Sequence, residues 1–104
     1  MKPIVFLPEA EQALLEAAYY YQLQSSGLSI DYLREVERAV QSITETPNTW
    51  PIIEGKLRRR LVRRFPFGIL YRIEPEDVVI IAIAHLRRKP GYWKNRINAY
   101  KLHI

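Results

Sequence analysis

Residues 57–84 read LRRRLVRRFPFGILYRIEPEDVVIIAIA, and three β-strand patterns follow one another in this stretch. Over residues 57–65 side chains alternate, with Leu57 and Leu61 on one face and Val62 on the other, which predicts an extended segment. The Pro66-Phe67-Gly68 triplet predicts a tight connection to a strand over residues 68–73. After the turn residues Glu74-Pro75-Glu76-Asp77, the Val/Ile run of residues 78–84 is typical of a central strand covered on both faces.

Two helices are predicted ahead of these strands. Residues 3–7 form a short strand pattern, and Pro8 suits the first turn of a helix over residues 8–24 that ends at Ser25-Ser26-Gly27. A second helix is expected over residues 28–44. The order is strand, helix, helix, strand, strand, strand. We therefore predict an α+β fold in which a helical hairpin packs on a small twisted antiparallel sheet.

The length and composition fit one domain over residues 1–104, with residues 97–104 as a C-terminal extension. The chain has 48% hydrophobic residues and no cysteine, which excludes a disulfide framework, a cysteine zinc site and a cysteine nucleophile. His85 and His103 lie far apart without a carboxylate pattern, so we expect no metal site. The glycines stand singly and form no phosphate-binding loop, and we expect no cofactor.

No stretch has the 18 or more consecutive apolar residues of a membrane span, and the first residues carry too few for a secretory signal. We therefore expect a soluble cytoplasmic protein without a membrane partner.

Charge divides the chain into two unlike halves. Residues 1–54 carry three basic and eight acidic side chains (3 − 8 = −5), whereas residues 55–104 carry thirteen and three (13 − 3 = +10). Such asymmetry indicates that one face meets a polyanion or an acidic protein segment.

Arginines supply most of this positive charge. The run over residues 58–64 puts them on both faces of one strand, which indicates a sheet edge or a strand with one wet face. Two interpretations remain open: a solvated edge protected from aggregation, or a surface that binds phosphate or an acidic peptide.

A second basic cluster, residues 85–96, directly follows the most buried strand pattern. Arginines there could clamp phosphates, while Tyr92 or Trp93 could stack on a base. Trp93 could instead fold back over the sheet edge, and His85 could be a general acid or base or a structural residue. The candidate residues for binding a nucleic acid or another target are Arg60, Arg64, Arg72, Arg87, Arg88, Lys89, Trp93 and Lys94.

Four segments resemble the RelE/ParE superfamily of bacterial toxins: residues 6–10, 32–39, 63–72 and 85–93. The resemblance implies a cytoplasmic toxin of a type II toxin–antitoxin system, of the plasmid stabilisation type. It also implies a helical hairpin against a twisted antiparallel sheet. RelE-like members are ribosome-dependent mRNA endonucleases, whereas ParE-like members poison DNA gyrase.

The resemblance favours the ParE-like branch. If the protein were a nuclease, the candidate catalytic residues would be His85, Arg88 and Tyr92. However, Gly68 stands where the RelE pattern has an arginine, which only a neighbour such as Arg60 or Arg72 could replace. A third hypothesis is a non-toxic basic module that binds nucleic acid.

The expected partners are DNA gyrase, or the ribosome and mRNA, and an acidic antitoxin that forms an oligomer with the toxin. We expect the antitoxin to use a helix and an extended segment, to lie on the sheet edge and the helical hairpin, and to contact Arg63 and Arg64.

Overall fold

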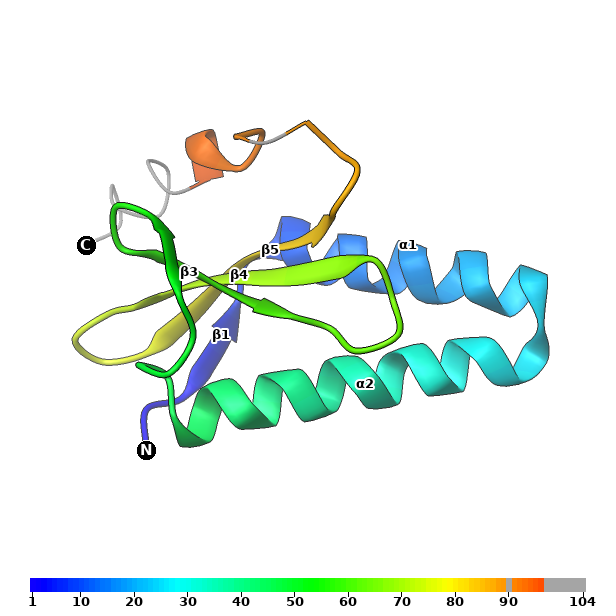
Figure 1. Ribbon diagram of the computed structural model, residues 1–104, viewed down its shortest axis with the longest axis horizontal. Helices are drawn as coiled ribbons and strands as arrows, with labels where there is room; N and C mark the ends of the chain where they lie inside the picture. Colours follow the sequence, from blue (N-terminus) through cyan, green and yellow to red (C-terminus); the bar gives the residue numbers. More distant parts are fainter. Residues whose placement is uncertain (90, 97–104) are drawn as a thin grey trace.

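The computed structural model describes residues 1–89 and 91–96, so the expected extension over residues 97–104 lies outside it. Its elements are β1 (Ile4–Phe6), α1 (Pro8–Gln24), α2 (Ser26–Glu45), β2 (Ile52–Glu54), β3 (Leu57–Leu61), β4 (Phe67–Ile73) and β5 (Val78–His85). The predicted α+β class and the helical hairpin are confirmed (Figure 1). The short strand β2 was not predicted.

Local sequence explains both helices. Pro8 opens α1, and Glu9 and Glu11 lie in its first turn, where the helix dipole favours negative charge. Ser25 alone connects the two helices, because its extended backbone (φ −167°, ψ 134°) ends one and begins the other. Gly27 consequently lies inside α2 and not in the connection. No helix in the described part of the chain is both long and apolar enough to span a bilayer.

The sheet has the order β1-β5-β4-β3-β2 and is mixed. β1 runs parallel to β5, whereas the other neighbours are antiparallel, so the expectation of a purely antiparallel sheet was wrong. The connection between this parallel pair contains both helices and the strands β2, β3 and β4. β2 turns back into β3 at Gly55, which has a positive φ of 55°. β3 therefore lies beside the edge strand β2 and is not itself an edge strand, although one of its faces is exposed to solvent.

Two apolar cores lie on opposite faces of the sheet. The larger one fills the space between the sheet and the hairpin, and its aromatic residues include Tyr21, Tyr32, Phe65 and Phe67, whose rings contact one another. The smaller one, on the outer face, is covered by Trp93 and Tyr92. The segment over residues 91–96 (orange in Figure 1) thus adds a third layer, away from α2. Tyr21 packs against the larger core, while Tyr19 and Tyr20 are exposed.

An irregularity in β5 sets which way the end of this strand faces. Tyr71 pairs with Ile80 and Leu70 pairs with Ala82, so Ile81 has no partner in β4. Beyond this bulge the alternation is shifted by one residue. Ile83 therefore faces the hairpin, and the ring of His85 packs against Phe67 with 5.1 Å between centroids.

The extended segment predicted over residues 57–65 stops early, at Leu61. Val62 donates a hydrogen bond to the Phe67 carbonyl at 2.9 Å, and Arg64 adopts a left-handed backbone with a φ of 70°. This loop places Phe65 in the larger core between the sheet and the helical hairpin, which we term the hairpin-side core. Strict alternation would instead place Phe65 on the same face of the sheet as Leu57.

Candidate functional site

Two arginines of β3 are used to build the fold. The Arg58 guanidinium donates hydrogen bonds to the carbonyls of Asn48 at 3.1 Å and Trp50 at 2.7 Å. Arg60 donates to Ser42 Oγ at 3.1 Å and stacks on the Trp50 ring with 4.2 Å to its centroid. Both side chains join the loop before β2 to the sheet. Arg60 is therefore not a free cation, contrary to its assignment from sequence.

Arg72 is also withdrawn from the surface. The residue is only 8% exposed, and its Nε lies 3.2 Å from Glu74 Oε1. The two groups lack the alignment of a hydrogen bond, so their attraction is electrostatic. The guanidinium of Arg72 is thus buried and paired within the protein, and the assignment of Arg72 to target binding stays a prediction.

Arg59 was not among the candidate residues identified from the sequence, but it lies over Gly68. Its aliphatic stem crosses Gly68, where an added Cβ would lie 3.1 Å from both Arg59 Cγ and Cδ. In the β3–β4 register Arg59 faces Leu70 and Leu61 faces Gly68, so Arg59 and Gly68 are diagonal neighbours on the outer face. The arginine that lies over Gly68 is therefore Arg59, and not Arg60 or Arg72. Only the pairing register of β3 with β4 identifies this contact.

His85 closes the turn that follows β5. Its Nδ1 accepts a hydrogen bond from the Arg87 amide at 3.1 Å, and the Arg88 amide donates to its carbonyl at 3.0 Å. Since Nδ1 is an acceptor, the neutral ring carries its proton on Nε2. Within the described residues no hydrogen bond joins the side chain of His85 to that of Arg88 or Tyr92. These contacts support the structural interpretation of His85.

The segment over residues 91–96 is fastened to the sheet by aromatic and cationic contacts. Trp93 is 8% exposed and packs in the outer core, so it covers the sheet and is not offered to a target. The Arg88 guanidinium lies 3.7 Å from the centroid of the Tyr92 ring, and that of Arg96 lies 5.2 Å from it. Arg96 also donates to the carbonyl of Ile81 at 3.2 Å, the residue that the bulge leaves unpaired in β4.

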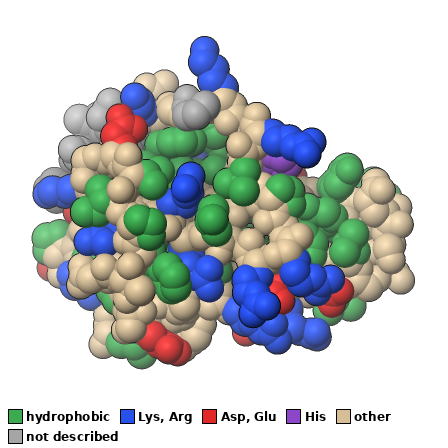
Figure 2. Space-filling view, in the orientation of Figure 1, with side chains coloured by type: hydrophobic (Ala, Val, Ile, Leu, Met, Phe, Trp, Pro, Cys, Tyr) green, Lys and Arg blue, Asp and Glu red, His purple; other side chains and the backbone are tan. Residues whose placement is uncertain are grey.

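These elements enclose a hollow of about 210 Å³ on the outer face, which we term the basic hollow. Its floor and walls include Leu70, Ala84 and Trp93, and its two arginines are Arg59 and Arg88. At its rim Lys94 pairs with Glu54 at 3.3 Å. Lys and Arg side chains are spread over the face shown in Figure 2, with few acidic side chains among them.

Arg63 and Arg64 project from the loop between β3 and β4, apart from the residues of the basic hollow. Both are exposed, and Arg64 lies 3.7 Å from Asp31 of α2. The buried neighbours Val62 and Phe65 fix the two ends of this loop. The loop therefore presents two positive charges beside the helical hairpin, where an acidic partner can reach them.

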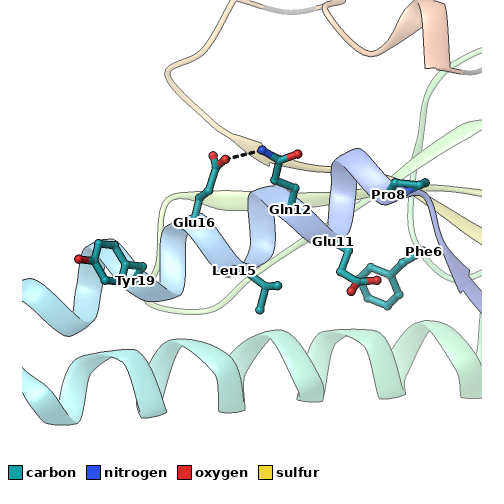
Figure 3. Close-up of a pocket in the computed structure, with 7 residues that line it drawn as sticks. All are labelled: Phe6, Pro8, Glu11, Gln12, Leu15, Glu16 and Tyr19. Atoms are coloured by element: carbon teal, nitrogen blue, oxygen red, sulfur yellow. Dashed lines mark hydrogen bonds between the residues drawn. The ribbon is translucent and has the colours of Figure 1, made fainter.

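A larger hollow of about 620 Å³ lies along α1 and is termed the α1 groove (Figure 3). Phe6, Leu15 and Tyr19 give it an apolar surface, and Glu11 and Glu16 make it acidic. Its charge is thus opposite to that of the basic hollow.

The tyrosines with raised pKa values belong to the hairpin-side core and not to either hollow. Burial raises the pKa of Tyr71 to about 12, although the nearby Arg58 opposes this shift. Burial, with a smaller contribution from Tyr21, also raises the pKa of Tyr32. These hydroxyls stay protonated and serve as donors, as Tyr71 does to the Pro47 carbonyl at 2.6 Å.

Comparison with known proteins gives a consistent result. The family model described as "ParE toxin of type II toxin-antitoxin system, parDE" matches residues 4–90. A solved structure described as the chromosomal ParDE TA system from P. aeruginosa superposes with a TM-score of 0.63 at 16% identity. That match covers 84% of this chain and 98% of the other. At this identity it supports the fold alone, and no curated protein matches the chain.

Proposed function

Because this chain belongs to the family of ParE toxins of type II toxin–antitoxin systems, we propose that it inhibits DNA gyrase in the cytoplasm until a cognate antitoxin neutralises it. The observation that carries the proposal is the family match over residues 4–90, which includes α1, α2 and the five strands of the sheet. The choice of gyrase follows from the resemblance of residues 85–93 to the ParE-like branch.

The contacts of the nuclease candidates also favour a toxin that binds its target over one that cleaves RNA. General acid–base catalysis needs a proton-transferring group that can approach the reacting atom. His85 instead uses Nδ1 within its own turn, and the Tyr92 ring is stacked with Arg88. Arg59 lies over Gly68, where the RelE pattern has an arginine, so this position does not distinguish the two branches.

We expect the helix and the acidic extended segment of the antitoxin to bind two different surfaces of this protein. The α1 groove is apolar but contains Glu11 and Glu16, which repel an acidic segment. We therefore place the apolar face of the antitoxin helix on α1 and its acidic extended segment near Arg63 and Arg64. This arrangement matches each part of the antitoxin to a surface of suitable polarity.

The first experiment adds the purified protein to two reconstituted reactions: supercoiling by DNA gyrase, and translation of a short message on programmed ribosomes. We expect inhibited supercoiling with accumulated cleaved DNA, and an intact message. An unrelated basic protein of similar net charge controls for non-specific inhibition, because this chain carries +5. A message cut at the A-site codon with unaffected gyrase would refute the proposal.

A further inference from the structure

The basic side chains of this protein fall into two groups by their contacts. Those of Arg58, Arg60, Arg72 and Arg96 are held by protein atoms. Other basic side chains, among them Arg34, Lys56 and Arg63, have no side-chain hydrogen bond or ion pair within the described residues. In and beside the basic hollow this is true of Arg59, Arg87 and Lys89, and Arg88 has only the Tyr92 ring. These four cations belong to the basic hollow or to the turn beside it. Their charge is left for a ligand from outside the chain.

The two arginines of the basic hollow are positioned before any ligand binds. The stem of Arg59 packs on the backbone of Gly68, and the Arg88 guanidinium lies 3.7 Å from the Tyr92 ring centroid. Stacking and packing reduce the rotamer freedom that each side chain would otherwise lose on binding. Arg59 and Arg88 line this hollow together with Glu54, whose carboxylate is paired with Lys94. Each guanidinium group can donate two parallel hydrogen bonds, so the two arginines suit an oxyanion.

We propose that the basic hollow binds a backbone phosphate of double-stranded DNA through Arg59 and Arg88. Arg87 and Lys89 continue the positive charge along the chain, which suits a polyanion with closely spaced phosphates better than a single carboxylate. This inference goes beyond the proposed inhibition of gyrase and does not depend on it, because the contact needs only the toxin and DNA.

The burial of Trp93 and the contacts of Tyr92 favour a duplex over single-stranded nucleic acid as the ligand of the basic hollow. Proteins that bind single strands stack bases on exposed aromatic faces. Trp93 is buried, and Tyr92 is already in contact with Arg88 and Arg96. Because neither Tyr92 nor Trp93 offers a free stacking platform beside the hollow, the contact there is to phosphate, and we expect binding without sequence preference.

The experiment measures fluorescence anisotropy of a labelled 20-base-pair duplex with the purified protein alone, over a series of salt concentrations. Arg59→Ala and Arg88→Ala should each weaken binding several-fold and lower the slope of log affinity against log salt by about one. Arg34→Ala is the matched control. It removes the same charge from an exposed position of α2, so its effect should be distinctly smaller.

Gly68→Ala provides a test in which the net charge does not change. The added methyl group would lie 3.1 Å from the stem of Arg59, so the stem must shift by a few tenths of an ångström. We expect the affinity for the duplex to fall, by less than for Arg59→Ala, while the circular dichroism spectrum stays that of the parent. Arg59→Lys, which keeps the charge but loses the planar fork, should fall between parent and Arg59→Ala.

Three results would overturn the proposal: no duplex binding at low salt, equal losses for Arg59→Ala and Arg34→Ala, or tighter binding of a single strand than of the duplex. Loss of antitoxin binding in Gly68→Ala with unchanged duplex binding would also overturn it and assign the hollow to a protein carboxylate. Because gyrase is absent from this assay, a failure of the proposed target leaves the result unaffected.

Discussion

Arg60 joins three parts of the fold through one side chain, namely β3, α2 and the loop that contains Trp50. Its guanidinium stacks at 4.2 Å on the Trp50 ring and donates to Ser42 Oγ. We expect Arg60→Ala to lower the free energy of unfolding by about 1–2 kcal/mol, because a half-buried cation–π contact and a hydrogen bond are lost. Urea unfolding measures the effect. Arg63→Ala, at an exposed and unpaired arginine, should change stability by less than about 0.5 kcal/mol, and equal effects would contradict the structural role.

The buried tyrosines make stability sensitive to alkaline pH. Unfolded tyrosines ionise near pH 10, whereas burial raises the pKa of Tyr71 to about 12 and also raises that of Tyr32. The folded chain thus keeps its protons longer, and the stabilisation is complete below pH 10 and is lost as pH rises from 10 toward 12. We expect the free energy of unfolding to decline over this interval. Denaturant titrations at pH 8, 10 and 11 measure it.

Tyr71→Phe separates this titration from other alkaline effects. The substitution should reduce the decline above pH 10, and it should cost about 1–2 kcal/mol at neutral pH because the Pro47 carbonyl loses its donor. Tyr19→Phe, on the exposed face of α1, is the matched control and should change neither quantity. A stability profile that is flat between pH 9 and 11 in the parent would refute this account.

The segment over residues 86–96 is held to the sheet chiefly by Trp93. Removing this ring opens the outer core, in which it packs with Leu70 and Ala84. We expect Trp93→Ala to cost about 3 kcal/mol and to speed trypsin cleavage after Arg87 and Arg88. Cleavage after Arg34 in α2 should stay slow, which distinguishes local release from global unfolding. Trp93→Phe should preserve most of the protection, and equal cleavage of both variants would count against the anchor.

The proposed binding of the antitoxin helix to α1 can be tested at an exposed stripe of apolar residues on this helix. Leu15, Tyr19 and Leu23 recur every four residues on α1 and are 57%, 66% and 67% exposed. Leu15→Ser with Tyr19→Ser should leave stability within about 0.5 kcal/mol but weaken antitoxin binding at least tenfold. Isothermal titration calorimetry measures the binding. Ile30→Ser, at a similarly exposed position of α2, is the control, and equal losses would argue against a seat on α1.

Periodicity predicted the elements of this fold better than their pairing. Pro8 and the 3.6-residue repeat predicted the bounds of α1 as they are observed, and the Val/Ile run predicted the interior strand β5, which lies between β1 and β4. The parallel pairing of β1 with β5 has no local signal, because it depends on the path of the crossover. β2 is only three residues long and is fully exposed, so it has no alternating pattern to find.

The candidate site was harder to predict for the same reason. The bulge at Ile81 shifts the alternation of β5, so counting in twos assigns His85 to the wrong face. Arg59 emerges as a site residue only when the β3–β4 register brings it to Gly68. Neither effect depends on residue type alone, and both require the neighbouring strand. In contrast, the surface position of Arg63, Arg64 and Arg87 followed directly from charge.

Within the described residues the ion pairs that join the two halves of the sequence include Arg64 with Asp31 at 3.7 Å and Lys94 with Glu54 at 3.3 Å, and the side chains of both pairs are largely exposed. Exposed pairs of this kind contribute little to stability. Most of the +10 of residues 55–104 is therefore available as a field that attracts acidic partners.

This field should control how fast the antitoxin associates. Reversing Arg63 and Arg64 to glutamate changes the net charge by −4 and places a carboxylate near Asp31, so we expect a slower association rate and a weaker dependence of that rate on salt. Stopped-flow mixing at low and moderate ionic strength measures both. Reversing Lys2 and Arg34 produces the same change in net charge away from the proposed seat of the acidic segment. If the two double variants slow association equally, only the total charge matters. If Arg63→Glu with Arg64→Glu leaves the affinity at low salt unchanged, the antitoxin does not contact this loop.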